Sequence, residues 1–421
     1  MRVYFIGIGG IGVSALAQYY LAEGHEVSGS DLVSSEITEF LEKKGIKLLK
    51  SIPKDVDLVI YSPAVKKLPQ IQGVKFLSYP EALGSLTKRY FTIAVSGTHG
   101  KTTTCAMISL IMIKAGFDPT VIIGAKLKEF GNSNFRKGKS KYFVIEADEW
   151  QASFLNYWPK IIVLTNIERE HLDYYKDLRH ILKTYREYIT HLSKEGILIV
   201  NGDDKNISKI KNQKSKFKCK IQNYSLNQGE VKKLRKVLKV PGEHNLYNAL
   251  AALTVARTLG ISDEISFKAL SGYRSAWRRF EIRNFRIKNL KFKIIHDYAH
   301  HPTEIKATLQ AAREKFSKKK IWCVFQPHQY QRTFYLFKDF VKALSSSRVD
   351  KMIITDIYDV AGREKKDIKK KIDSKKLAQA IKGAKYLEKD KIKKYLKNNL
   401  KGGEIVIIMG AGDIYELFCE F

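Results

Sequence analysis

Cysteine is scarce in this sequence, and its few occurrences are far apart. The four residues are Cys105, Cys219, Cys323 and Cys419 in a chain of 421, and no two of them form a C-x-x-C pair. A disulfide framework needs dense cysteines, and a structural zinc site needs them at short spacing. The sequence therefore argues against both and favours a reduced, cytoplasmic enzyme.

Long apolar runs are also missing. No run approaches the ~18 residues that would indicate a membrane span. The first residues, "MRVYFIGIGG", pass directly from an apolar strand into a glycine turn, without the three regions of a signal peptide. We therefore expect a cytoplasmic protein with no stable membrane insertion.

Acidic residues are few compared with basic ones. The chain has 43 of the former and 75 of the latter, which gives a net charge of +32. Lysines are densest at 363–376 and 387–403, where acids and apolar residues at helical spacing accompany them. That pattern is typical of solvated helix faces, so we predict no nucleic-acid partner. A basic nucleic-acid-binding protein stays as an alternative, and the charge would in any case attract nucleotides.

The chain has three blocks in which short apolar strands alternate with helical patterns. They cover residues 1–89, 90–279 and 280–421. Three domains are the number expected for a chain of this length at about 150 residues per domain. Strands that alternate with helices predict an α/β fold with parallel sheets, and ligands of such sheets gather at the carboxyl ends of the strands. A lysine-rich stretch at 205–239 interrupts the second block.

The second block opens on "FTIAVSGTHGKTTTCAMI", a strand followed by a glycine turn and an apolar helix. Its Gly100-Lys101-Thr102 matches the end of a Walker A loop, but the first glycine of that pattern would fall on Val95, and the spare glycine is Gly97. Backbone N–H groups at such a turn face an anion. We predict that Lys101 reaches the β- and γ-phosphates of a nucleotide and that Thr102 binds Mg²⁺.

A second glycine turn, "GIGGIG", follows the first strand of the chain. Gly7, Gly9 and Gly12 fit the dinucleotide pattern G-x-G-x-x-G, and Asp31 lies 19 residues beyond Gly12. The turn fits the diphosphate of NAD as well as that of a UDP-sugar. A nicotinamide-dependent oxidoreductase therefore remains an alternative, although it gives Lys101 no role.

Acidic and basic side chains follow several predicted strands. Glu146, Asp148 and Glu149 come directly after one strand and His171 follows the next. Carboxylate oxygens beside a phosphate-binding loop suit Mg²⁺. Farther along, Arg332 in "PHQYQRT" suits a substrate carboxylate or phosphate through its fork of donors.

Ten motifs along the chain occur in the order found in one enzyme family: GIGGIG, SGSD, GTHGKTTT, EADE…ASFL, TNIEREHLD, GEHNLYNALAAL, WRRFE, DYAHHPTEI, FQPHQYQRT and GAGDI. In these motifs the sequence resembles the Mur ligases, the ATP-dependent amide-forming enzymes of peptidoglycan synthesis. The resemblance implies three domains. The first is a Rossmann-like, UDP-binding domain, the second a central P-loop ATPase-like domain with a parallel sheet, and the third a Rossmann-like domain that closes over ATP and the amino acid.

The resemblance also implies roles for individual residues. Those expected to bind the UDP-sugar are Gly7, Gly9, Gly10, Ile11, Gly12 and Asp31. Those expected to bind ATP are Gly97, Thr98, His99, Gly100, Lys101, Thr102, Thr103, Asn245, Arg279 and Asp297. The expected metal ligands are Thr102, Glu146 and His171, and the expected substrate cleft contains Tyr298, His300 and Arg332. Catalytic roles fall to Lys101, Arg279 and His300.

Two of these roles have a structural alternative that the residues alone do not decide. Asn245 follows Pro241-Gly242 at the start of a helical pattern and could cap that helix instead of contacting adenine. Arg279, near a predicted domain boundary, could be a surface arginine of the hinge.

Within the family, the motifs are most similar to those of the member that joins L-alanine to UDP-N-acetylmuramate. The substrates implied are UDP-N-acetylmuramate, L-alanine and ATP with Mg²⁺, and we expect a monomer or homodimer. Two positions depart from the usual "DDYGHHP": His296 replaces an acid and Ala299 a glycine. The alanine is shared by the murein-tripeptide recycling ligase, which therefore stays as an alternative.

Overall fold

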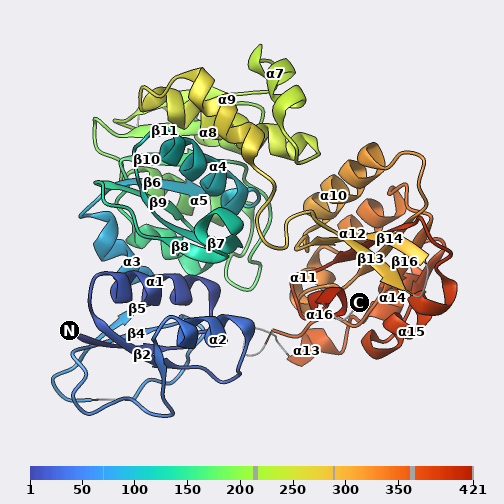
Figure 1. Cartoon of the computed structure of the whole chain (residues 1–421), viewed down its shortest axis with the longest axis horizontal. Coiled ribbons are helices and arrows are strands. Elements are labelled where there is room, and N and C mark those ends of the chain that lie inside the picture. Colours follow the sequence, from blue (N-terminus) through green and yellow to red (C-terminus); the bar gives the residue numbers. More distant parts are fainter. Residues whose placement is uncertain (70, 212–216, 288–289, 361–365, 420–421) are drawn as a thin grey trace. The chain divides into compact units, whose positions relative to one another are not determined.

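The computed structural model describes residues 1–69, 71–211, 217–287, 290–360 and 366–419. Three sheets, built mostly of parallel strands and flanked by helices, follow one another along the chain (Figure 1). The predicted α/β class and three-domain architecture are thereby confirmed, while the boundaries at 89 and 279 stay predictions. By its contacts the chain divides into two compact units, a first of Met1–Glu168, Leu178–Val237 and Tyr247–Tyr273 and a second of Arg169–Asp177, Leu238–Leu246 and Arg274–Phe421.

The first sheet is parallel, with strand order β3-β2-β1-β4-β5. Its strands are β1 (Arg2–Ile6), β2 (Glu26–Ser30), β3 (Lys47–Leu48), β4 (Leu58–Tyr61) and β5 (Lys75–Ser78). Its helices are α1 (Ile11–Ala22), α2 (Glu36–Lys43) and α3 (Tyr79–Thr87). Because β1 lies in the middle, the glycine turn that follows it opens at the centre of the sheet's carboxyl edge.

The central sheet has the order β12-β11-β10-β6-β9-β7-β8, and β8 runs antiparallel to β7. Its strands are β6 (Phe91–Ser96), β7 (Thr120–Leu127), β8 (Ser133–Arg136), β9 (Tyr142–Glu146), β10 (Ile161–Leu164), β11 (Ile197–Asn201) and β12 (Lys220–Tyr224). Its helices are α4 (Lys101–Lys114), α5 (Leu178–Ile189), α6 (Lys205–Lys211), α7 (Glu230–Val237), α8 (Glu243–Thr258) and α9 (Asp263–Gly272). The lysine-rich stretch 205–239 thus supplies an edge strand and two helices of this layer.

The first two sheets belong to one unit because two helices of the first pack on the second. Helix α1 lies against β7 and β8 (Figure 1). There the Gln18 amide donates to Asn134 Oδ1 at 2.9 Å, and Asn134 Nδ2 donates to Ser14 Oγ at 3.0 Å. These three side chains are buried. Buried polar groups that satisfy one another fix how the elements fit, so this network sets the position of α1.

Helix α3 makes the other junction, against the 3-10 helix η2 (Trp150–Asn156) that follows β9. A Cβ on Gly84 would lie 2.3 Å from the Asn156 carbonyl oxygen, so only glycine allows this approach. Helix α3 is therefore held against the segment that follows β9.

The third sheet has the order β13-β14-β18-β15-β16-β17, with β13 antiparallel to β14. Its strands are β13 (Glu281–Ile287), β14 (Leu290–Asp297), β15 (Ile321–Phe325), β16 (Lys351–Ile354), β17 (Ala384–Tyr386) and β18 (Ile405–Met409). Its helices are α10 (Pro302–Lys315), α11 (Tyr330–Tyr335), α12 (Phe337–Ser345), α13 (Lys366–Lys369), α14 (Ser374–Gln379), α15 (Lys389–Asn399) and α16 (Tyr415–Cys419). Leu172, from the segment 169–177, packs against the core of this unit.

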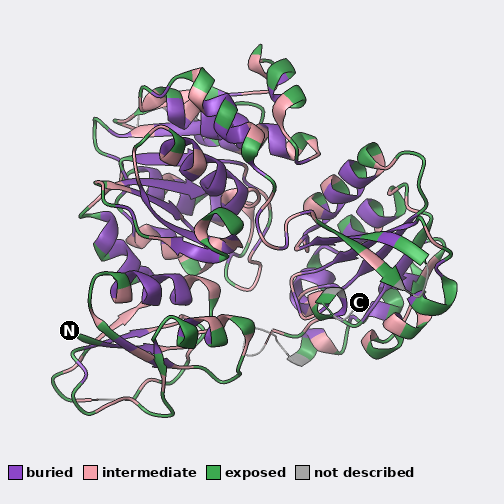
Figure 2. Ribbon diagram, viewed as in Figure 1, coloured by how far each residue is buried: buried purple, intermediate pink, exposed green. Residues whose placement is uncertain are grey.

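Burial follows the predicted layers, with buried strands inside helices that expose their outer faces (Figure 2). Strands β10 and β18 are buried along their whole length. In α15, Ile392 and Leu396 face the core while Lys391, Lys394 and Lys397 are exposed, as the solvated-face interpretation of 387–403 predicts. Residues 363–365 of the other lysine-rich segment lie outside the described residues. Within the described ranges, no helix combines the length and the apolar character that a membrane crossing needs.

Candidate functional site

The glycine turn between β6 and α4 can be formed only by glycine at two positions. Gly97 has φ +132° and Gly100 has φ +85°, backbone conformations that other residues rarely adopt. A Cβ on Gly97 would lie 2.1 Å from Thr165 Oγ1, and one on Gly100 would lie 2.3 Å from Asn248 Oδ1. Val95, where a Walker A loop would have glycine, is still a buried strand residue. The turn therefore begins two residues later than in that pattern.

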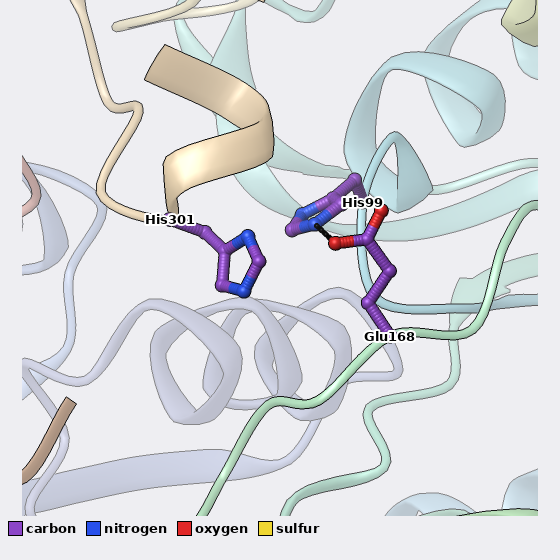
Figure 3. A group of neighbouring side chains, drawn as sticks. All are labelled: His99, Glu168 and His301. Carbon is purple, nitrogen blue, oxygen red and sulfur yellow. Dashed lines mark ion pairs between the residues drawn. The ribbon is translucent and has the colours of Figure 1, made fainter. Parts of the chain in front are cut away.

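The turn is braced by the segment that follows the neighbouring strand β10. The N–H groups of Thr98 and His99 donate to the carbonyl and to the side-chain oxygen of Asn166, both at 2.9 Å. Thr165 Oγ1 donates to the His99 carbonyl at 2.6 Å. The His99 ring points toward Glu168, with Nε2 and Oε2 3.6 Å apart (Figure 3). Thr165 and Asn166 were not predicted to be site residues, although their place after a strand of the same sheet was the available signal.

Lys101, the first residue of α4, is held on both sides of its ammonium group. Its Nζ donates to the Gly97 carbonyl at 2.7 Å and to Glu149 Oε2 at 2.9 Å. Burial opposes the charged form, but the carboxylates of Glu149 and Asp148 outweigh it and raise the pKa of Lys101. The lysine is therefore cationic and already faces an anion. Glu149, only 2% exposed, was noted as a strand-end acid, but the pairing with Lys101 was not predicted.

Oxygen ligands for a cation lie beside this turn. Glu146 ends β9 opposite Val95 of β6, and Thr102 is a buried residue in the first turn of α4. The Gly124 N–H donates to Glu146 Oε1 at 2.6 Å, and a Cβ on Gly124 would lie 2.8 Å from Oε2. Hydroxyl and carboxylate oxygens fit a hard cation such as Mg²⁺. His171 belongs to the second unit, so its predicted place in the same metal site stays a prediction.

The first glycine turn, after β1, is bound by Asp31, the acid predicted to belong to the same UDP-sugar site. The Gly9 N–H donates to Asp31 Oδ2 at 2.7 Å, and Asp31 Oδ1 accepts the Leu32 N–H at 2.7 Å. Gly7 has φ +75° and Gly10 precedes α1, which Ile11 begins. The helix start faces the turn, an arrangement that suits a diphosphate. The role of Asp31 toward a ligand stays a prediction.

In the second unit, Asp297 at the end of β14 fastens two backbone segments. Its oxygens accept the N–H groups of Phe280 at 2.7 Å and Ala299 at 2.8 Å. Burial raises the pKa of Asp297 to about 6, although Arg279 favours the carboxylate. The Arg279 guanidinium lies 4.8 Å from the ring centre of Tyr298, so these two predicted residues are brought together.

The two adjacent histidines have separate partners. His300 Nδ1 lies 3.2 Å from Glu304 Oε2 and 3.1 Å from the Tyr298 carbonyl. Burial lowers the pKa of His300 to about 4, against the effect of Glu304, so the ring is neutral at pH 7. His301 caps α10, its Nδ1 accepting the Thr303 N–H at 3.3 Å. The two rings therefore have different partners.

Arg332 uses its donors on a carboxylate of the chain itself. Its Nη2 and Nε donate to Glu170 Oε1 at 2.8 and 3.0 Å, and both side chains are buried. Burial opposes ionisation, but Arg332 and nearby histidines hold the pKa of Glu170 well below its usual range. The guanidinium donors of Arg332 therefore bind the Glu170 carboxylate in this structure. Their binding to a substrate stays a prediction.

Arg278, which the sequence analysis passed over in favour of Arg279, holds the last glycine turn. Its Nη2 donates to the carbonyls of Gly410 and Gly412, both at 2.9 Å. Its guanidinium also lies 4.5 Å from the ring centre of Tyr415. His296 stacks on the same ring, and burial lowers its pKa to about 2, so it remains neutral. The turn after β18 is thus tied to the segment that precedes β13.

Asn245 lies inside the first turn of α8, which begins at Glu243. Its amide donates to the Pro241 carbonyl at 2.7 Å. An N-cap residue would precede the helix and accept from its N–H groups, so the capping alternative is wrong. The adenine contact stays a prediction.

Three family models match successive parts of the chain. They are the Mur ligase family catalytic domain at residues 2–91, the Mur ligase middle domain at 95–256, and the Mur ligase glutamate ligase domain at 278–412. Together they cover most of the sequence.

Full-length relatives agree with these matches. The chain is 42% identical to UDP-N-acetylmuramate–L-alanine ligase of Acetivibrio thermocellus over 99% of its length and 94% of the relative. Among solved structures, UDP-N-acetylmuramate–alanine ligase MurC from Thermotoga maritima matches with a TM-score of 0.80 and 28% identity, covering 100% of this chain and 98% of that one. A murein peptide ligase from Psychrobacter arcticus shares the fold, with a TM-score of 0.73, 22% identity, and coverage of 100% and 98%. The chain belongs to the Mur ligase family.

Proposed function

We propose that this chain is an ATP-dependent ligase of peptidoglycan precursor synthesis that joins L-alanine to the lactyl carboxylate of UDP-N-acetylmuramate. The observation that carries the proposal is the turn at residues 97–102, in which Gly97 and Gly100 have positive φ and Lys101 is held as a cation. The relatives at 38–42% identity over nearly the whole chain bear the same activity in their names.

The reaction needs ATP because a carboxylate is a poor electrophile. A carboxylate oxygen attacks the γ-phosphorus, ADP leaves, and an acyl phosphate forms. The amine of alanine then attacks the carbonyl carbon, forms the C–N bond and loses a proton. The C–O bond to the phosphate breaks, and inorganic phosphate leaves with the bridging oxygen. The protein contributes mainly by positioning the reactants and by neutralising the negative charge that develops.

The first unit supplies the phosphate-binding part of the site. Lys101 would release Glu149 and bind the β- and γ-phosphates, since its charge is preserved by the surrounding carboxylates. Thr102 and Glu146, joined by His171 from the second unit, would hold Mg²⁺. When bound, the ion neutralises phosphate charge.

The second unit would supply groups for the amino acid and for charge on the transferred phosphate. Arg279, with Tyr298 against its guanidinium, would reach the phosphates. His300 is neutral at pH 7, so its ring would be able to accept a hydrogen bond from the incoming amine. Arg332 would bind the carboxylate of alanine by exchanging it for Glu170, the carboxylate it holds in this structure.

The direct test supplies UDP-N-acetylmuramate, ATP, Mg²⁺ and L-alanine and measures ADP and the amide product. We expect one ADP per amide and no product when any component is omitted. Glycine and serine are the competitors to include, because a pocket separates side chains by only about 1–3 kcal/mol per methylene. Absence of the amide under these conditions would refute the proposal.

One observation favours a second candidate, the recycling ligase that attaches a free murein tripeptide. Ala299, which replaces the usual glycine, is buried and its N–H is bonded to Asp297. The same incubation with the tripeptide in place of alanine distinguishes the two. ATP turnover with the tripeptide alone would favour the recycling activity.

A further inference from the structure

Tyr79, the first residue of α3, was given no role by the motifs. A capping box fixes its backbone: the Ser78 N–H donates to Glu81 Oε2 at 2.7 Å, and Ser78 Oγ accepts the Glu81 N–H at 3.5 Å. Helix α3 itself is held against η2 through Gly84. The side chain of Tyr79 is therefore presented from a rigid element.

The ring of Tyr79 covers the start of α1. A Cβ on Gly12 would lie 2.9 Å from both Cζ and Oη of Tyr79, so the third glycine of the first turn is required by this ring. The hydroxyl thus lies beside the turn that we assign to the diphosphate of the UDP-sugar.

The same hydroxyl is also influenced by acids of the central sheet. Burial raises the pKa of Tyr79, and the negative charges of Glu146 and Asp148 raise it further. The phenol therefore stays protonated and able to donate. The side chain of Tyr79 is half-buried.

An acceptor that places its diphosphate on the first turn and its carboxylate at the 97–102 turn, beside Glu146, must pass between these two points. We propose that Tyr79 contacts the acceptor there, its hydroxyl donating a hydrogen bond to the muramate portion between the diphosphate and the lactyl carboxylate. The inference rests on the proposed function. Tyr79 would thus recognise the muramate sugar, whereas the glycine turn would recognise only the diphosphate.

The test is Tyr79→Phe, which keeps the ring on Gly12 and removes the hydroxyl. Titration calorimetry of the full chain, without ATP, measures binding of UDP-N-acetylmuramate and of UDP. We expect the variant to bind UDP-N-acetylmuramate three- to tenfold more weakly, as for loss of one neutral hydrogen bond of about 1 kcal/mol. Its affinity for UDP and its melting temperature should equal those of the wild type.

Tyr20→Phe is the matched control, because Tyr20 is a buried tyrosine near the other end of α1. At 1.5 Å per residue, it lies about 12 Å along the helix from Gly12. It should leave both affinities unchanged. Equal affinity of the wild type and Tyr79→Phe for UDP-N-acetylmuramate would overturn the inference alone, and so would an equal loss for UDP. Failure of the wild type to bind UDP-N-acetylmuramate would instead overturn the proposed function, and the inference with it.

Discussion

Replacing Lys101 with methionine should separate the two functions of this side chain, in stability and in catalysis. The side chains of Lys101 and Glu149 are 15% and 3% exposed and their charged atoms lie 2.9 Å apart. Methionine preserves the apolar stem but leaves the Glu149 carboxylate buried without its cation. Removal of one partner of a buried ion pair costs roughly 3–5 kcal/mol. At about 2–4 °C per kcal/mol, the melting temperature should fall by at least ~6 °C.

The double variant Lys101→Met, Glu149→Gln removes the uncompensated charge and should recover most of that loss. Neither variant should form ADP, because the cation that binds the phosphates is absent from both. Thermal unfolding followed by circular dichroism and ADP release measured at saturating substrates give the two readouts. A double variant as unstable as the single one would refute the account of the pair, and turnover by either would refute the role of Lys101.

Three further substitutions, one of them with a matched control, test other parts of the site. Gly100→Ala should abolish ATP binding by calorimetry, whereas Gly116→Ala, with φ +80° and no atom within 4 Å of its Cβ, should cost only about 1–2 kcal/mol and bind normally. Because the pKa of His300 is lowered to about 4, the folded state resists protonation, and its free energy of unfolding falls as the pH falls from about 6.5 to 4. His300→Gln should reduce that fall by on the order of 3 kcal/mol. Unfolding curves that depend on pH in the same way for both proteins would contradict this. Gly124→Ala should displace Glu146 and raise the Mg²⁺ concentration for half-maximal turnover, while an unchanged Mg²⁺ dependence would exclude Glu146 as a ligand.

Much of the fold could be predicted because the strands are buried on both faces and read as apolar runs. Two of the strands that were overlooked lack this property. Strand β3 has only two residues, and the edge strand β12, with the sequence KIQNY, is largely polar. An edge strand can expose one side to water, so its polarity conceals it from a pattern-based prediction.

The site was predictable where a backbone conformation demands a residue type. Gly97 and Gly100 could be recognised because only glycine fits the turn, and Lys101 because it follows them. The partners that hold these residues come from distant parts of the chain. Asn248 packs on Gly100, and Glu149 pairs with Lys101, through contacts that local spacing does not encode. Arg278 and Arg279 are adjacent and alike in sequence, and only the fold shows which of them binds the carbonyls of the glycine turn.

The central claim is that the turn at 97–102 presents a γ-phosphoryl group to a carboxylate of the acceptor. The most direct measurement uses UDP-N-acetylmuramate carrying ¹⁸O in both carboxylate oxygens, with ATP, Mg²⁺ and L-alanine, and mass spectrometry of the inorganic phosphate released. Transfer to the carboxylate predicts one ¹⁸O in each phosphate formed. Unlabelled phosphate, produced together with the amide, would contradict it.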